Sequence, residues 1–274
     1  MATKKKITKV GGDEPSSTQK ETNFPEAEAE KRQAENGSKM FEASPESKGK
    51  ANQLRLFAFL AWIIAIAGQI FAIMKLLNDE MLVYLIIAII VILALAITAS
   101  VLWKKANRLD PASEKEKVRF FIQNQLGAIM GVLAFLPLVI LIFTNKNLSK
   151  HTKGIAGSIA VVALLIAGIT GVDFNPASIE QYTEQTKEIE ILNEGFNNVY
   201  WTPSGTRYHL YQDCSYINTD RTSEIFEGTV AQARELKNIT QLCSRCRERR
   251  MKEKGITEND LKTKLTEELS KIVE

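Results

Sequence analysis

The sequence predicts a mostly α-helical membrane protein with about four transmembrane helices, a disordered N-terminal tail and a small α+β C-terminal domain that binds zinc. Three observations lead to this prediction. Long runs almost free of charge lie between residues 56 and 172 of the 274-residue chain, and densely charged sequence flanks them. The first 52 residues are polar. All three cysteines lie in the last third of the chain, together with one of its two histidines.

We expect five segments along the chain. They are a disordered polar tail at 1–52, a four-helix transmembrane region at 53–174, a linker helix at 175–197, a zinc-binding module at 198–250 and a charged C-terminal helix at 251–274. The tail is rich in Glu, Lys, Ser, Ala and Gln, so it buries too little apolar surface to offset the entropy that ordering costs. Met40 and Phe41 are isolated bulky residues in it, and a docking role for them is the alternative.

Four apolar segments each approach the roughly 20 residues that a helix needs to cross a bilayer. They run over about 56–77, 81–103, 126–143 and 155–172, and an amphipathic lead-in to the third starts at Val118. Only three polar residues separate the first two segments, which predicts a tight helical hairpin. Buried helices of a soluble protein are the alternative, but these runs are longer and contain fewer polar residues than a soluble core needs.

The distribution of Lys and Arg predicts the orientation, because cytoplasmic loops carry an excess of both. Such residues precede the first helix and fill the connection between the second and third, at Lys48, Lys50, Arg55, Lys104, Lys105, Arg108, Lys115, Lys117 and Arg119. We therefore expect a multi-pass protein of the cell membrane with both termini in the cytoplasm. Lys146, Lys150 and Lys153, in the loop assigned to the outside, favour the opposite orientation.

The apolar segments have the composition of a scaffold in the lipid bilayer. Small residues recur four positions apart, which lets helix backbones approach closely; the pairs are Gly127 with Gly131, Ala61 with Ala65, and Gly68 with Ala72. No Asp, Glu, Arg or His lies near the middle of an apolar run, whereas ion and proton pathways usually need one. Nothing in these segments indicates transport.

His209, Cys214, Cys243 and Cys246 form the candidate metal site. Their spacing is His-x4-Cys, then 28 residues, then Cys-x2-Cys. This is the number and kind of ligands of a closed tetrahedral zinc site. Clustering of thiols beside a histidine fits metal ligation in a reducing compartment, and three cysteines cannot all pair in one chain.

The sequence around these residues predicts how they meet. Residues 199–202 and 207–210 are β-prone and flank a Pro-Ser-Gly turn, so a hairpin would aim the histidine toward Cys214. Thr229 and Gln232 can cap a helix over 230–237 that returns the chain to the last two cysteines. A module of this size has a small core, so a metal would stabilise it.

We expect one structural Zn²⁺ and no catalysis. Catalytic zinc needs an open position and a general base, whereas all four ligands are committed here and no His-x-Glu motif precedes the cysteine pair. A nucleophilic Cys214 with His209 as its base is an alternative, with Asp213 as the nearest carboxylate along the chain. A thiol-redox or metal-responsive switch at Cys243 and Cys246 is another, because neighbouring arginines would lower the thiol pKa.

Residues 245–254 form an Arg-rich run after the last cysteines. Such a run could contact nucleic-acid phosphates or the anionic inner leaflet of a membrane. Glu248 and Glu253 interrupt it, which favours a solvated helix face. Membrane-tethered nucleic-acid binding is therefore an alternative function.

Parts of the C-terminal module resemble a known family. These parts are residues 199–202, Ser204-Gly205, Tyr208-His209, Asp213-Cys214, residues 231–233 and Cys243-x-x-Cys246, within about a fifth of the chain. They look like a small module at the ends of diverse bacterial membrane and secreted proteins, similar to the metal-binding domain of the Ada DNA-repair protein. That domain uses four cysteines and accepts a methyl group on one of them, an activity that we do not transfer because a histidine takes one ligand position here. The resemblance implies a bacterial protein that binds zinc at His209, Cys214, Cys243 and Cys246.

Together, these patterns predict a polytopic membrane protein that presents a cytoplasmic zinc module for protein interaction or sensing. Its expected partners are the lipid bilayer and a protein that the sequence does not identify.

Overall fold

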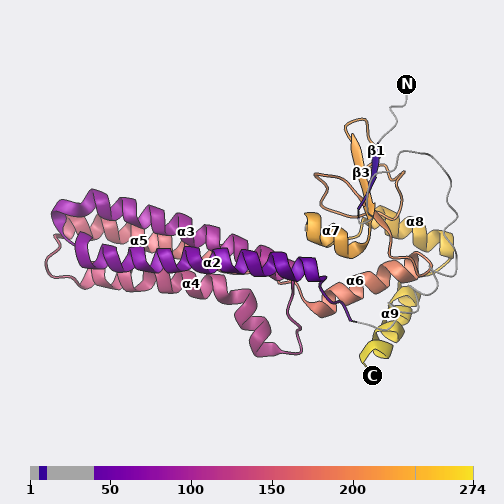
Figure 1. Cartoon of the computed structure of the whole chain (residues 1–274), viewed down its shortest axis with the longest axis horizontal. Coiled ribbons are helices and arrows are strands. Elements are labelled where there is room, and N and C mark those ends of the chain that lie inside the picture. The colour runs from indigo at the N-terminus through magenta and orange to yellow at the C-terminus, as the bar shows by residue number, and fades with distance from the viewer. Residues whose placement is uncertain (1–5, 11–39, 238, 274) are drawn as a thin grey trace. The chain divides into compact units, whose positions relative to one another are not determined.

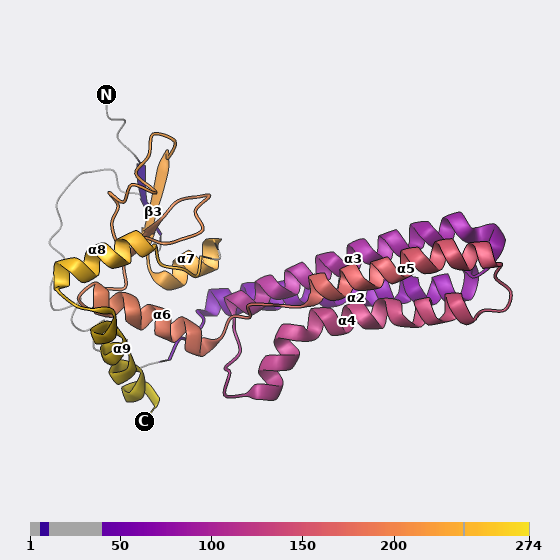
Figure 2. The same ribbon diagram turned by 180° about the vertical axis from the view of Figure 1, so that it is seen from behind.

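The computed structural model describes residues 6–10, 40–237 and 239–273. Residues 11–39 of the expected tail lie outside these ranges. The chain divides into two compact units. One unit is Ala43–Ser178, and the other combines Met1–Glu42 with Ile179–Glu274. Figures 1 and 2 show the elements of both units from opposite sides.

The first unit consists of four long helices that lie lengthwise beside one another (Figure 1). They are α2 (Pro45–Phe71), which continues in a π-helical turn (Ala72–Leu76), α3 (Leu82–Leu109) after a 3₁₀ turn (Asp79–Met81), α4 (Lys117–Thr144) and α5 (Lys150–Gly171). With these turns included, the helices have 32, 31, 28 and 22 residues. At about 1.5 Å per residue, even the shortest exceeds the roughly 30 Å of a bilayer's hydrocarbon core. The prediction of four helices that are long and apolar enough to cross a membrane is confirmed.

The α2–α3 connection is tight, as its three polar residues predict. The Asn78 side chain accepts a hydrogen bond from the Met81 amide at 2.9 Å and so caps the 3₁₀ turn. The Asp79 carboxylate accepts one from the Ser149 amide at 3.0 Å. Because Ser149 is the N-cap of α5, the acidic turn also ties the hairpin to the α4–α5 loop.

Close packing of small residues joins α4 to α5. A Cβ atom at Gly127 would lie 2.7 Å from the Gly171 carbonyl oxygen, and one at Gly131 would lie 3.0 Å from that of Ala167. On α2, Ala65 is completely buried. The small residues spaced four apart therefore lie at helix contacts, as predicted, because only residues without a bulky side chain allow two backbones to approach this closely.

The described residues of the second unit form a three-stranded sheet and four helices. Its elements are β1 (Lys6–Lys9), α6 (Ile179–Leu192), β2 (Val199–Trp201), β3 (Glu224–Gly228), α7 (Val230–Lys237), α8 (Ser244–Lys254) and α9 (Glu258–Val273). The strand order is β1-β3-β2, with β1 parallel and β2 antiparallel to β3.

The N-terminal segment differs from the expected tail of residues 1–52 at both of its ends. Strand β1 occupies Lys6–Lys9, and α2 begins at Pro45. The Ser44 hydroxyl accepts a hydrogen bond from the Ser47 amide, and proline suits the first helical position, so the helix start is locally favourable. Main-chain pairing with β3 holds β1, and composition cannot reveal so distant a partner.

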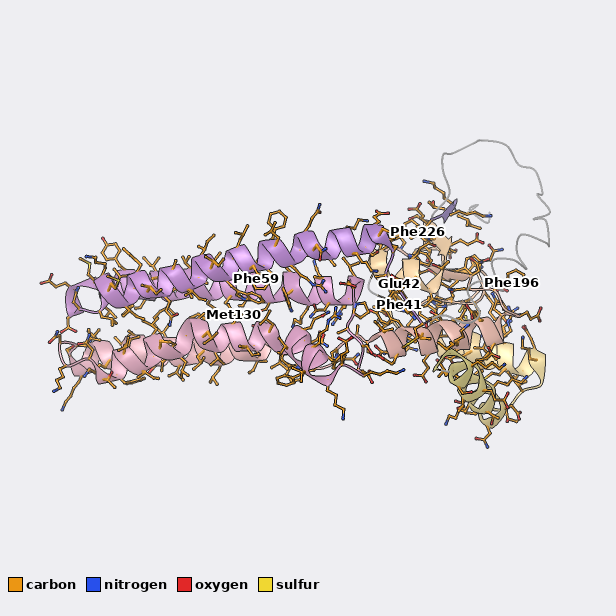
Figure 3. The ribbon with its side chains drawn as sticks, turned by 60° about the horizontal axis from the view of Figure 1, so that its bottom comes forward. Phe41, Glu42, Phe59, Met130, Phe196 and Phe226 are labelled. Atoms are coloured by element: carbon orange, nitrogen blue, oxygen red, sulfur yellow. The ribbon has the colours of Figure 1, made fainter. Side chains whose placement is uncertain are left out.

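The expected strand at 207–210 is replaced by an isolated bridge between Tyr200 and His209. The pairing direction is as predicted, but the middle strand of the sheet is β3, which the sequence analysis missed. β3 pairs with β2 over three residues and places Ile225 in the core. Phe226, labelled in Figure 3, lies 6.0 Å from the Trp201 ring.

Helix α6, which we expected to be a linker, lies in the same compact unit as the metal module. Its Ile189 and Leu192 are completely buried in a core that also includes Trp201. The helix therefore provides one wall of the module. Its amphipathic pattern predicted an apolar stripe but could not identify what covers that stripe.

Phe41 docks on α6, in line with the alternative to a plain tail. Its ring meets Tyr182 edge to face at 5.1 Å, and its amide donates to the Thr183 hydroxyl at 2.8 Å. Figure 3 labels Phe41 where it approaches this helix. β1 and Phe41 thus attach two points of the N-terminal segment to the C-terminal unit.

Candidate metal centre

His209, Cys214, Cys243 and Cys246 lie together in the second unit. Their ligand atoms are all within 4.8 Å of one another, and each residue is at most 6% exposed. The Cys246 Sγ and His209 Nδ1 atoms are 3.6 Å apart. In tetrahedral coordination with Zn–S near 2.3 Å and Zn–N near 2.1 Å, a sulfur and a nitrogen ligand are also about 3.6 Å apart. The four residues could therefore hold one metal ion, and the distance of this pair is the one expected for zinc.

Main-chain hydrogen bonds on both sides fix the position of His209. The amide and carbonyl of His209 each bond to Tyr200 at 2.7 Å. The neighbouring Tyr208 amide donates to the Gln241 carbonyl at 3.0 Å, and the Tyr208 carbonyl accepts from the Cys243 amide at 2.9 Å. One short extended segment therefore places the histidine and the first cysteine of the Cys-x-x-Cys pair side by side.

The Cys-x-x-Cys pair lies at the start of α8. Cys243 is the N-cap residue, and Cys246 lies in the first turn. Amides at a helix N-terminus lack partners inside the helix and carry partial positive charge, which favours thiolate ligands. The Leu210 amide also donates to the Cys246 sulfur.

Arginines of α8 attach the loop that carries Cys214. Arg249 donates to the Asp213 carboxylate at 3.0 Å, directly before the cysteine. Arg245 donates to the Ser215 hydroxyl at 2.9 Å, directly after it. The same helix thus carries two ligands and holds the loop of a third. Asp213, the carboxylate considered as an orienting group for a nucleophilic cysteine, pairs with an arginine instead.

The electrostatics of the cluster suit a cation. Burial, and then the nearby Arg207, lower the pKa of His209 to about 4, so the imidazole is neutral and its nitrogen can act as a ligand. Burial and the neighbouring Cys214 and Cys243 raise the pKa of Cys246 to about 12. Several thiolates in so small a volume need a compensating charge, which a divalent ion supplies.

Arg234 is a buried residue that the sequence analysis did not single out. Its guanidinium lies 4.2 Å from the centroid of the Tyr182 ring and donates to the Tyr182 carbonyl at 3.1 Å and the Gln185 side chain at 2.8 Å. Burial lowers the pKa of Arg234 to about 10. It joins α7 to α6, and an arginine in a short polar helix has no local pattern that indicates such burial.

Comparisons with models of protein families, with curated proteins and with solved structures found no match to this chain. The resemblance to the Ada-type module therefore stays a prediction. What the structure defines is a class of site: a buried group of one histidine and three cysteines that could hold a metal ion.

Proposed function

We propose that this chain is a multi-pass membrane protein that carries one structural zinc ion in a cytoplasmic module and uses that module for protein interaction or sensing. One observation carries the proposal: four ligand residues from three separate parts of the sequence meet in a buried cluster with atoms within 4.8 Å of one another. No catalytic step is proposed.

The chemistry of the cluster supports a structural role. Structural zinc sites are closed by four protein ligands, whereas catalytic sites keep one position for water or substrate. The cluster contains no carboxylate, and its four residues are too buried to admit a substrate. The ligand set of three thiolates and one imidazole suits zinc.

Surface composition of the first unit supports insertion into a bilayer. Large apolar side chains are exposed along all four helices, among them Ile63, Ile90, Leu133 and Leu165. An apolar surface of this extent is unfavourable in water but matches lipid acyl chains. The cytoplasmic assignment of both termini rests on the Lys and Arg distribution along the sequence.

The nucleic-acid alternative is weakened by the partners of the Arg-rich helix. Arg247 binds Glu188 and Glu258, both at 2.6 Å, and Arg249 binds Asp213. Arg250 donates to the Asn193 side chain at 3.1 Å. Arg247 and Arg250 therefore connect α8 to its neighbours within the fold, whereas the ion pair of Arg249 with Asp213 is about half exposed. The redox alternative ranks below structural zinc because thiolate reactivity needs access, and the three thiols are buried.

Metal analysis of the full chain in detergent tests the site. We expect one zinc per chain, loss of zinc in His209→Ala, and full retention in His151→Ala, which removes the only other histidine. Chelation should also reduce the helix and sheet content of the wild type. A chain without zinc that keeps its fold under chelation would contradict the proposal.

Reporter fusions test the orientation. A fluorescent protein that matures only in the cytoplasm, fused after Glu274, should fluoresce. An alkaline phosphatase that is active only outside should be inactive there and active when inserted at Asn147, in the α4–α5 loop. The reverse pattern would show the opposite orientation.

A further inference from the structure

The first turns of α4 form an apolar surface without a protein partner among the described residues. We call residues 117–122 the α4 foot. It leans away from the other helices of its unit, as both views show (Figures 1 and 2). Val118 is 73% exposed and Phe121 61%, and Phe174, just after α5, is 79% exposed. In the sequence, Val118 and Phe121 come before the apolar run that starts near residue 126, and Phe174 comes after the run that ends near residue 172.

The α4 foot and the residues just before it carry several basic side chains. Residues 104–119 contain six Lys or Arg and three acidic residues, a net charge of +3. Lys115 and Lys117 are exposed, and the ion pair of Arg119 with Glu116 is open to solvent on both sides. Exposed pairs of this kind are weak and exchange readily. The α4 foot therefore combines apolar side chains with available positive charge.

Side-chain hydrogen bonds fix the base of the α4 foot. The Trp103 indole and the Asn107 amide group both donate to the Gln123 carbonyl at 2.6 Å. The Gln123 side chain donates to the Asp110 carbonyl at 3.0 Å. Donors that compete for a helical carbonyl are a known cause of helix bending. The foot is thus attached to the end of α3 and is not a frayed helix end.

This combination matches the interface of a membrane. Amphipathic segments with apolar residues on one side and Lys or Arg beside them lie at the boundary of headgroups and acyl chains. Anionic lipids add an attraction of about 1 kcal/mol for each basic residue close to the surface.

We propose that the α4 foot, together with Phe174, is a binding surface for anionic phospholipids of the leaflet that it faces. Val118, Phe121 and Phe174 enter the acyl boundary. Lys115, Lys117 and Arg119 contact lipid phosphates. This inference rests on the proposed insertion of the helices into a bilayer and adds a lipid class to it.

Thermal unfolding of the full chain in bilayer discs tests this inference. Discs of phosphatidylcholine alone are compared with discs that also contain phosphatidylglycerol. Preferential binding of a ligand to the folded state raises Tm, and we expect a rise of about 3 °C with the anionic lipid. The rise should shrink as salt increases from about 0.1 to 0.5 M, because ions screen exposed charges.

Two triple variants separate this surface from charge in general. The combination Lys115→Gln, Lys117→Gln and Arg119→Gln should lose most of the rise. The matched control, Lys146→Gln, Lys150→Gln and Lys153→Gln, removes the same charge from the α4–α5 loop and the first turn of α5, at the other end of the helices, and should keep the rise. Equal helix content by circular dichroism in all three chains verifies that the variants are folded.

An equal response of both triple variants, or no effect of phosphatidylglycerol on a reconstituted chain, overturns the inference and leaves the membrane proposal intact. An equal rise from inorganic phosphate would assign the surface to free anions and also overturn it. A chain that is soluble without detergent and fails to enter discs would overturn the proposed function itself.

Discussion

The Sγ atom of Cys246 lies 3.6 Å from the Nδ1 atom of His209, although the two residues are 37 positions apart in the sequence. One comes from the first turn of α8 and the other from a bridge beside β2. A metal ion at this place would join the sheet side of the module to its helical side. Because the unfolded chain cannot preform such a site, binding of the proposed metal would contribute directly to folding.

Removal of one ligand should therefore affect both binding and folding. We expect Cys246→Ser to lower zinc affinity by at least roughly 100-fold and to reduce the structure of the module, since a structural zinc site supplies folding free energy. Competition with a coloured chelator measures the affinity, and circular dichroism measures the structure. Ser244→Ala, an exposed neighbour on the same turn, is the control. Wild-type affinity in the cysteine variant would exclude this residue as a ligand.

Arg247 should be the most sensitive arginine of α8. It binds Glu188 of α6 and, through two nitrogens, Glu258 at the start of α9. Lysine cannot reproduce this geometry, so we expect Arg247→Lys to lower the free energy of unfolding by about 1–2 kcal/mol. Denaturant titration checks this value.

Arg249 provides the comparison within the same helix. Its ion pair with Asp213 is about half exposed, with side chains 47% and 59% accessible. We expect Arg249→Lys to cost less than about 1 kcal/mol, because exposed pairs are weak. If both substitutions lowered the free energy of unfolding by the same amount, burial of an ion pair would not determine how much it stabilises this fold.

Lowering the pH should destabilise α9. A hydrogen bond from Arg247 lowers the pKa of Glu258, and hydrogen bonds from Thr257 lower that of Asp260. Both carboxylates therefore stabilise the folded state above their ordinary pKa values of about 4, and this stabilisation is lost as pH falls through the lowered values. We expect the hydrogen-exchange protection of α9 to fall more in the wild type than in Glu258→Gln with Asp260→Asn as the pH drops below about 4. An identical loss of protection would show that these groups do not control the helix, since the candidate metal ligands are the same in both chains.

The α4–α5 contact should tolerate no added side chain at Gly127. Its Cβ would lie 2.7 Å from a backbone oxygen, which cannot move as a side chain can. We expect Gly127→Ala to destabilise the helical unit by about 1–3 kcal/mol. Gly168→Ala is the control, because a Cβ at that position meets nothing within 4 Å. Thermal stability in detergent distinguishes them, and an unchanged Gly127 variant would contradict the observed packing.

Deletion of residues 1–10 should open the edge of β3. The four-residue strand β1 protects this edge, and Thr8 and Lys6 both contact the Glu224 carboxylate. Unpaired strand edges exchange faster and promote aggregation. We expect hydrogen exchange of residues 224–228 to rise at least about tenfold, as for a locally opened strand. Unchanged exchange would mean that β1 does not cover the edge in solution.

The sequence alone determined the features that depend on local chemistry. Long apolar runs predicted the four helices because hydrophobic length is a property of the segment itself. The pair Thr229 and Gln232 predicted α7, and the two side chains do bond to each other's amides at 3.2 and 2.8 Å. The candidate ligands were predicted because one histidine and three cysteines at such spacing are rare outside metal sites.

Only the tertiary structure decided which distant segments meet. It placed β3 between β1 and β2, brought α6 into the core of the module, and buried Arg234 against Tyr182. It also gave the arginines of α8 partners on α6, α9 and the Cys214 loop, where the sequence suggested a solvated face. The physical reason is common to all of these features. Strand pairing, burial and ion pairing depend on the partner that covers a residue, and here that partner lies far away along the chain.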